Sequence, residues 1–587
     1  MRPMTGRLLL AFSLLLPAAA GRCAETRNPG SFVQLVTRSW FTLEPIAASD
    51  SVSFIVVGNV YEPLLAFKSV SDTEHFEPFL AAQVPSRENG LVSEDGTTYT
   101  FPIREGVVFH SGDPLTPEDV RYSLLRYMLN DAEGAASSIL LRPVLGISST
   151  RDAQGRIVAD FREAERAVRV EGGSVVVRLK RPYRSFLKVV ASLPIVVSKK
   201  WAVEHGEWDG SAGTWQGLNN RPFEKSYFHE HMNGTGPYAL SRADQKAGEL
   251  VLRRNDGYWR KPAALELVHI RTAECTALRM NMLENGDADS GYFEDRDIRD
   301  VRELPGVRVV DGLPYSSMGE ILYFNFDTDP ASELLGSGKL DGQGVPPDFF
   351  KDRLVREGFA YALDFEKYRS HGMAGRGARA CGPVPGSLLP CSGKAPYGYD
   401  LRKAKKAFQR AMGGRLWKEG FSLVLAFSPS NANRLVLAHI IKSNIEKLNP
   451  KFKVRLRVMP SSELYDAAAA HRVPLLISGY YADYPDPECY FFGLLHSSGY
   501  WPKAQRYSSP RTDELIEKAA ASRDDGERTR LYREITRAAL EDLPQVYTYL
   551  PGGFRAARSW VKGLDSGQNV SNMGFNNFPY FYVLSKE

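Results

Sequence analysis

The sequence predicts an α/β protein with at least two lobes, and three observations support this fold class. Strands alternate with helices over residues 421–479, and a shorter stretch at 265–288 repeats that pattern. Such alternation is typical of a parallel sheet covered by helices. The chain has 587 residues, of which 43% are hydrophobic and 24% charged, so it can bury more than one core.

The first twenty residues predict a secretory signal peptide. Arg2 and Arg7 precede the apolar run at 8–16, and small residues follow it up to Ala20. This order of basic, apolar and small residues is that of an export signal, so we expect cleavage near Ala20 and a periplasmic protein. Cys23 lies near the position of a lipidated cysteine, but Arg22 stands where that signal needs a small residue, which disfavours a lipid anchor.

The charge of the chain does not favour nucleic acid as a partner. Removing residues 1–20 takes away Arg2 and Arg7 and no acid, so the net charge falls from +5 to +3. A large basic excess would be needed to bind the phosphate backbone. Outside the signal peptide no apolar run approaches the roughly 18 residues of a membrane span.

The first strongly marked element is a strand and helix pair. Residues 98–103 predict a strand, and after a turn the motif Thr116-Pro117-Glu118-Asp119 predicts the start of a helix. Its apolar face then consists of Val120, Leu124 and Met128. Further on, a strand at 265–270 precedes a helix at 273–285, which Gly286 ends, and a short apolar return follows near Ala288.

The later lobe shows the most regular alternation. It is predicted to contain strands at 421–427, 453–458 and 474–479, with helices at 433–448 and 462–470 between them. Ligands of open α/β sheets bind at the carboxyl ends of the strands, where two loops are expected, at 428–431 and 480–487. The second loop combines aromatic rings, carboxylates and prolines, which suits a ligand with a cation and an apolar body. The alternative is a solvent-facing turn in which Asp483 and Asp486 cap backbone groups.

Five cysteines are too few for disulfides to be the main support of a chain of this length. Cys381 and Cys391 bracket the Gly- and Pro-rich stretch CGPVPGSLLPC. In an oxidising compartment these two thiols can pair, so we predict a disulfide there. Two unpaired thiols are the alternative.

Short motifs are spread over almost the whole mature chain. They are NVYEPLL at 59–65, EPFLA at 77–81, SEDG at 93–96, YTF at 99–101, REGV at 104–107, FH at 109–110, Gly112, PEDV at 117–120, NGTGPY at 233–238, RNDGYW at 254–259, YALD at 361–364 and ADYPDP at 482–487. By their number and order, these motifs resemble the family 5 extracellular solute-binding proteins of the peptide- and nickel-binding type.

The resemblance implies a type II periplasmic-binding-protein fold, in which two lobes close on a ligand like a Venus flytrap. Lobe I would comprise residues 21–64, 190–314 and 545–587, with an inserted subdomain at 65–189. Lobe II would comprise residues 315–544. The two crossings between the lobes should fall near 311–315 and 543–547.

The resemblance also implies a function. The protein would be the substrate-binding component of an ABC importer that captures a di- or oligopeptide by lobe closure and delivers it to a permease and ATPase complex. It would act as a monomer and need no cofactor. A non-peptide solute on the same fold, such as a nickel chelate or haem, is the alternative, and a sensing or adhesion role without a transporter also stays open.

The family resemblance nominates several residues for the binding site. Asp483 matches the aspartate that pairs with the ligand's α-ammonium group, and the preceding Gly479, Tyr480 and Tyr481 match residues that offer backbone groups and a ring. Trp40 belongs to a segment expected to run along the other side of the ligand. Its alternative role is that of a core anchor.

The binding partner of the ligand carboxylate is less well defined by the resemblance. Dipeptide binders carry an arginine in the loop after the strand at 421–427, where this chain has Ser428. The nearest arginine is Arg434, which can equally be a helix-surface charge. Dipeptide specificity therefore stays open, and Ser428 and Arg434 are both candidate ligand contacts.

Two rival site classes have only fragments in this sequence. Ser185 and Lys188 have the S-x-x-K spacing of acyl-serine hydrolases, but the companion S-D-N and K-T-G motifs are missing, so no catalytic residue is assigned. For a metal or haem site, His371 and His496 are the histidines to test. Since the histidines are scattered, no metal ligand is assigned.

Overall fold

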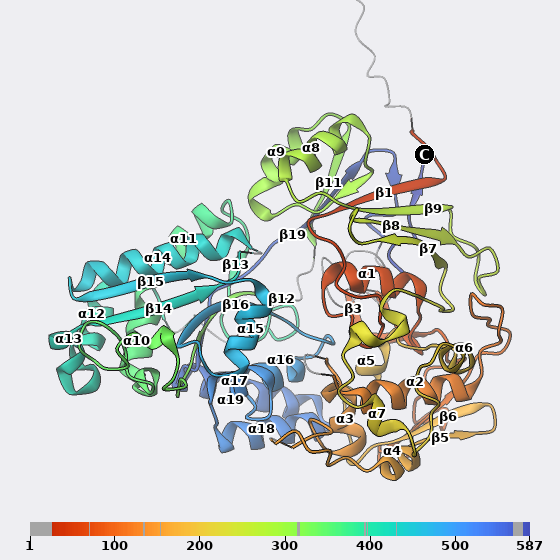
Figure 1. Cartoon of the computed structure of the whole chain (residues 1–587), viewed down its shortest axis with the longest axis horizontal. Helices are drawn as coiled ribbons and strands as arrows, with labels where there is room; N and C mark the ends of the chain where they lie inside the picture. Colours follow the sequence, from red (N-terminus) through yellow and green to blue (C-terminus); the bar gives the residue numbers. More distant parts are fainter. Residues whose placement is uncertain are drawn as a thin grey trace, which may run out of the picture.

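The computed structural model describes part of the chain, namely residues 26–587 without 70, 133–134, 153, 314–316, 392–394, 396, 430 and 567–578. The predicted signal peptide and Cys23 therefore lie outside the described residues. The described chain forms two large sheets with helices packed around them, and a third, mostly helical region lies below the first sheet (Figure 1).

The first sheet has seven strands in the order β11-β19-β10-β1-β9-β8-β7. Its central strand β1 runs parallel to both of its neighbours, β9 and β10. The strands are β1 Ser31–Val36, β7 Tyr238–Asp244, β8 Glu249–Arg254, β9 Leu267–Thr272, β10 Ser290–Gly291, β11 Val307–Leu313 and β19 Gly553–Arg558. The helix predicted at 273–285 is α8, Thr276–Asn285, and it ends at Gly286 in the left-handed conformation, as expected.

The second sheet has five strands in the order β15-β14-β16-β12-β17. The strands are β12 Ser317–Phe324, β14 Phe421–Phe427, β15 Phe452–Val458, β16 Leu475–Tyr481 and β17 Gln545–Tyr547. The three predicted strands are confirmed and run parallel. β12 pairs antiparallel with β16, and β17 pairs antiparallel with β12, so β12 alone runs against the other four strands. Helices α14 (Ala432–Leu448) and α15 (Ser461–Ala469) connect the parallel strands, as predicted (Figure 1).

A bulge in β12 shapes the edge of this sheet. Met318 pairs with Tyr480 and Ile321 with Ser478, so Gly319 and Glu320 together stand opposite Gly479. A side chain at position 319 would lie 2.6 Å from the Tyr549 ring, which explains the glycine.

Residues 65–189 form the third region. It contains the hairpin of β2 (Leu65–Ser69) and β3 (Asp72–Pro78) and a sheet of β4 (Thr98–Pro102), β6 (Ser174–Arg178) and β5 (Val168–Glu171). Its helices are α2 Pro117–Asn130, α3 Ser138–Leu145, α4 Phe161–Ala167 and α5 Phe186–Ala191. The predicted start of α2 is confirmed, because Thr116 and Asp119 form a reciprocal capping box and Pro117 occupies the first helical position.

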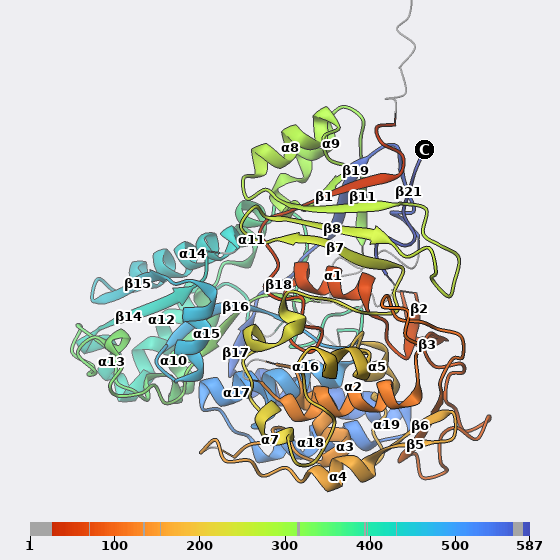
Figure 2. The ribbon, with the colours of Figure 1, turned by 45° about the vertical axis from the view of Figure 1, so that its right-hand side comes forward.

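Four helices reach from the second sheet to this third region, and they appear in blue beside the orange segment in Figures 1 and 2. They are α16 Pro487–Leu495, α17 Tyr500–Gln505, α18 Pro510–Ala521 and α19 Asp525–Asp542. On the sheet side, Gln505 donates a hydrogen bond to the carbonyl of Phe324 over 2.8 Å. On the other side, Arg142 of α3 donates to Glu488 of α16 over 2.9 Å.

Two further α-helices, α6 Lys199–Glu204 and α7 Trp215–Leu218, pack against α2 of the third region. The remaining α-helices lie around the two large sheets. They are α1 Ser51–Val60, α9 Ile298–Glu303, α10 Arg353–Ala362, α11 Phe365–Gly372, α12 Leu401–Arg410 and α13 Arg415–Glu419.

The chain passes between the two large sheets twice. The first passage joins β11 to β12 and includes 314–316, which lie outside the described residues. The second joins β17 to β19, and β17 pairs with β12. Residues 545–547 therefore belong to the five-stranded sheet, although the sequence assigned them to lobe I. The reason is that β17 finds its hydrogen-bond partners on β12 before the chain crosses.

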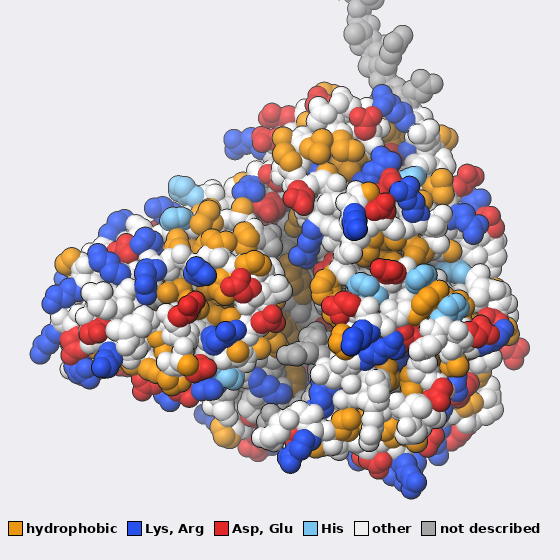
Figure 3. All heavy atoms as spheres, in the orientation of Figure 1, with side chains coloured by type: hydrophobic (Ala, Val, Ile, Leu, Met, Phe, Trp, Pro, Cys, Tyr) orange, Lys and Arg blue, Asp and Glu red, His pale blue; other side chains and the backbone are white. Residues whose placement is uncertain are grey.

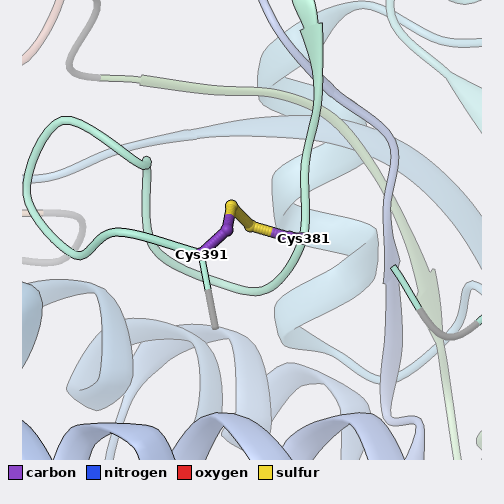
Figure 4. The surroundings of a disulfide bond; sticks show 2 residues. All are labelled: Cys381 and Cys391. Carbon is purple, nitrogen blue, oxygen red and sulfur yellow. A yellow bond between two sulfur atoms is a disulfide. The ribbon is translucent and has the colours of Figure 1, made fainter. Parts of the chain in front are cut away.

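The predicted disulfide is present. Cys381 and Cys391 are bonded, with their Cα atoms 6.0 Å apart, and they close the loop between them (Figure 4). Among the described residues, Cys275 and Cys489 are free thiols, the first exposed and the second buried.

Candidate functional site

Asp483 lies just beyond the carboxyl end of β16, where the sequence predicted it. Its side chain is exposed, yet the surrounding protein removes enough water to raise the pKa of its carboxyl to about 6. Among the described residues no cation contributes to this shift and none forms an ion pair with Asp483. The backbone N–H of Asp483 donates to the Cys489 sulfur over 3.3 Å. A carboxylate that is accessible, partly desolvated and uncompensated is suited to bind a cationic group.

Tyr480 and Tyr481 are part of β16 and not of the loop, because the strand runs two residues beyond its predicted end. The side chains of neighbouring strand residues point to opposite faces. Tyr480 is half-buried, and its hydroxyl donates to the carbonyl of Cys489 over 3.0 Å. Tyr481 is 51% exposed, although nearby protein raises the pKa of its phenol to about 12. Tyr481 is therefore the ring that faces the open site.

A second exposed ring comes from the other large sheet. Tyr292 directly follows β10 and is 39% exposed. Burial raises the pKa of its phenol, and the charge of Tyr481 adds to this shift, so the two rings lie within electrostatic range of each other. Figure 3 shows a groove between the two halves of the molecule. The rings thus bring residues from both sheets to one space.

The other nominated residues of lobe II are less accessible than Tyr481: Gly479 is half-buried, and Ser428 and Arg434 are buried. A side chain at Gly479 would lie 3.2 Å from the carbonyl of Gly319 in the bulge. Ser428 is buried, and its hydroxyl forms a hydrogen bond of 2.7 Å with that of Ser461. Arg434 is buried in the first turn of α14. The role of these three residues in ligand binding stays a prediction.

Arg434 lies beside an acid that the β12 bulge places there. Its Nε is 3.9 Å from the carboxylate of Glu320, which is itself 2% exposed. Glu320 also accepts hydrogen bonds from Asn431 over 2.7 Å and from Tyr368 over 2.6 Å. The Arg434 charge is therefore balanced within the protein, which makes it a poor clamp for a ligand carboxylate.

Trp40 is a core residue in this structure. Only 5% of its surface is exposed, and its backbone carbonyl accepts a hydrogen bond of 2.8 Å from Gln245. This matches the alternative interpretation of Trp40 as a core anchor.

The S-x-x-K fragment has no arrangement for catalysis. Both residues are buried, and Ser185 accepts a hydrogen bond of 3.0 Å from Arg528. The ammonium group of Lys188 is bonded to Glu74 and, over 3.1 Å, to Asp486. Bound to two carboxylates, this ammonium group cannot take a proton from Ser185, as a catalytic base would have to.

The two histidines nominated for a metal or haem site have protein partners. His371 is exposed, and its Nδ1 lies 2.9 Å from the hydroxyl of Ser370. His496 is buried against the Phe492 ring, with its Nε2 3.3 Å from Glu517. Within the described part of the chain, no three His, Cys, Asp or Glu side chains gather as a metal site would require.

Sequence reasoning missed the main role of Asp486. It caps α16 through the N–H of Glu488, as the capping alternative proposed, but it is also fully buried in an ion network. Its carboxylate accepts from Arg528 over 2.7 Å and from Lys188 over 3.1 Å. Burial alone would raise the pKa of Asp486, but these two cations hold it well below its usual range.

A comparison with models of protein families identifies the family of this chain. The model for bacterial extracellular solute-binding proteins, family 5, matches residues 75–502. The chain belongs to this family. Within it, the chain is 25% identical to di/tripeptide-binding protein 2 of Pseudomonas aeruginosa, covering 98% of this chain and 99% of the relative. It is 23% identical to heme-binding protein A of Haemophilus influenzae, covering 92% and 90%.

Solved structures confirm the fold of this solute-binding protein. The periplasmic binding protein DppA of Helicobacter pylori, in complex with the peptide STSA, superimposes with a TM-score of 0.72 at 20% identity, over 95% of this chain and 98% of that one. The predicted two-lobe α/β fold of the periplasmic-binding-protein type is thereby confirmed. Among the described residues no helix has both the length and the apolar character needed to span a bilayer.

Proposed function

We propose that this protein is the extracytoplasmic substrate-binding component of an ABC importer and that it captures short peptides for a membrane permease and its ATPase. The observation that carries the proposal is the uncompensated carboxylate of Asp483 at the carboxyl edge of β16. The di/tripeptide-binding relative and the peptide bound to DppA support a peptide ligand. The proposal includes export by the signal peptide at 1–20, with cleavage near Ala20.

The ligand's ammonium group would serve as the counter-ion of Asp483. When the site closes, the ammonium group loses its water, and a hydrogen-bonded carboxylate then offsets that loss. The exposed rings of Tyr481 and Tyr292 offer faces that attract a cation or cover an apolar side chain. Backbone groups near Gly479 would bind the peptide bond.

Closure would bring two lobes together around this site. We assign the seven-stranded sheet and residues 65–189 to lobe I and the five-stranded sheet to lobe II, with the hinge at the two passages between the sheets. The ligand stabilises the closed form by the contacts that only the closed form makes. Tyr292 and Tyr481 come from different sheets, so such contacts exist here.

Asp483→Asn tests the amine-binding role. The change keeps the shape and removes the charge, and truncating one partner of a buried charge pair typically costs about 2–5 kcal/mol. Peptides identified by mass spectrometry of the purified protein should bind the variant roughly 30-fold more weakly or worse in calorimetry. N-acetylated forms of the same peptides should bind both proteins poorly.

The control is Asp256→Asn, which removes an exposed aspartate that pairs with Arg254 in lobe I. It should bind like the wild type. Equal affinity of Asp483→Asn and wild type would refute the amine-anchor role. A nickel chelate or haem would then be the better ligand class, and the haem-binding relative supports that alternative. An absorption spectrum and metal analysis of the purified protein would reveal such a ligand.

A further inference from the structure

The strand ends of lobe I place one segment beside the proposed ligand site. In the seven-stranded sheet β1 and β10 are parallel neighbours, with Leu35 opposite Gly291. The N–H of Tyr292 donates to the carbonyl of Leu35 over 3.2 Å. The residues that follow β1 therefore leave the sheet at the same edge as the exposed Tyr292 ring, and Arg38 is the exposed residue there.

Arg38 differs from the other arginines near this edge because its charge is uncompensated. Among the described residues it has neither a hydrogen bond nor an ion pair. Arg434, by contrast, lies beside Glu320, and Arg376 is bound to Asp295 over 2.8 Å. The guanidinium of Arg555 stacks on the ring of Tyr580, 4.4 Å from its centre. Arg38 is thus the arginine available to a ligand.

Arg38 also lies within reach of the lobe that carries Asp483. Burial raises the pKa of the Tyr481 phenol, and the positive charges of Arg434 and Arg38 oppose that shift. Tyr481 belongs to lobe II and precedes Asp483 by two residues. One uncompensated cation from lobe I thus lies within electrostatic range of Tyr481, two residues before the uncompensated anion of lobe II.

We propose that Arg38 binds the carboxylate of the ligand whose amino group Asp483 holds, so that the site selects short peptides with both termini free. This rests on the proposed peptide function. The planar guanidinium can donate two parallel hydrogen bonds to a carboxylate, which gives direction as well as attraction. Because the two charges come from different lobes, a zwitterion gains both partners only when the lobes close.

The test compares two peptide libraries of two to four residues, one with free carboxyl termini and one amidated. Each is offered to wild type, Arg38→Gln and Arg38→Lys, and the retained peptides are quantified by mass spectrometry. The wild type should prefer the free acids roughly 10- to 100-fold, the usual value of a hydrogen bond to a charged group. Arg38→Gln should lose that preference, and Arg38→Lys should keep part of it.

A control variant tests whether another exposed cation, and not Arg38, binds the ligand carboxylate. Lys503 of α17 is also exposed, and burial lowers its pKa, although the charge of Asp131 opposes this. Lys503→Gln should keep the preference for free acids. If Lys503→Gln loses the preference, or if Arg38→Gln keeps it, the assignment of Arg38 is wrong.

A third library with N-acetylated termini separates this proposal from the proposed function. Arg38→Gln should still prefer free amino termini, because Asp483 is unchanged. A wild type that prefers free amines but does not distinguish acids from amides refutes the role of Arg38 alone. A wild type that retains none of the libraries refutes the peptide function, and the role of Arg38 falls with it.

Discussion

Asp483 and Asp486 stand three residues apart in the same loop, yet their surroundings are opposite. Asp483 is exposed, no cation in the described part of the chain pairs with it, and its pKa is raised to about 6. Asp486 is fully buried, and Arg528 and Lys188 hold its pKa well below the usual range in spite of that burial. One end of the loop thus carries a charge that lacks a partner, while the other end has two.

The difference shows how a binding loop can be held in place at one end and still present an available charge at the other. Every carboxylate that loses water needs compensation. For Asp486 the protein supplies it, through residues of α5 and α19 that tie the loop to the inserted region. For Asp483 we propose that the ligand supplies it. The buried end fixes the position of the loop, so the accessible end can keep its charge for the solute.

The largest expected effect comes from removing the buried charge. Asp486→Asn leaves Arg528 without its ion-pair carboxylate in the interior and leaves Lys188 with Glu74 alone. Breaking such a buried pair costs about 3–5 kcal/mol. Because the folded pKa lies below the unfolded value of 3.8, the carboxylate's contribution is present above pH 3.8 and is lost as the pH falls below it.

Urea unfolding at pH 7 measures this loss, with Asp483→Asn as the control. That control removes a carboxylate which the folded state disfavours, so it should not lower the free energy of unfolding. If both variants lose the same free energy, the contrast between the two acids is wrong.

The next effect is a pH dependence of binding that belongs to Asp483 alone. The ligand's ammonium group favours the ionised carboxylate, so binding must lower a pKa that is about 6 in the free protein. Affinity should therefore fall as the pH drops through 6, by about tenfold between pH 7 and pH 5. Calorimetry of a co-purified peptide measures it, and in Asp483→Asn the profile should be flat. An equally steep profile in that variant would place the titrating group elsewhere.

The sequence predicted the strands and helix ends that depend on residues close together in the chain. The strand at 421–427, the helix after it and the start of α2 were all predicted, because apolar periodicity and capping residues act over a few positions. The position of Asp483 at a strand end followed from the same pattern together with the family motif.

The sequence could not show which distant side chains meet. Lys188 and Asp486 are 298 residues apart in the chain, and Arg142 and Glu488 are 346 apart. Local patterns carry no information about such pairs, so the sequence indicates Lys188 only as part of an S-x-x-K fragment. In the same way, the bulge that brings Glu320 beside Arg434 depends on the register of β12 against β16.

The smallest expected effect lies at Cys489, which connects the two ends of the loop. It is part of α16, the helix that Asp486 caps, and its sulfur accepts the N–H of Asp483 over 3.3 Å. Burial raises the pKa of this thiol, so it stays neutral and adds no charge to the site. Sulfur is a weak acceptor, so losing this hydrogen bond should cost about 0.5–1 kcal/mol of binding, or two- to fivefold in affinity.

Cys489→Ala removes that acceptor, whereas Cys489→Ser keeps one in nearly the same place. Peptide calorimetry should therefore show weaker binding for the alanine variant and recovery for the serine variant, at similar free energies of unfolding. If Cys489→Ala binds as tightly as the wild type, the sulfur does not position Asp483. The anchor at Asp486 would then be sufficient to hold the loop, and the two acids would be coupled through the backbone alone.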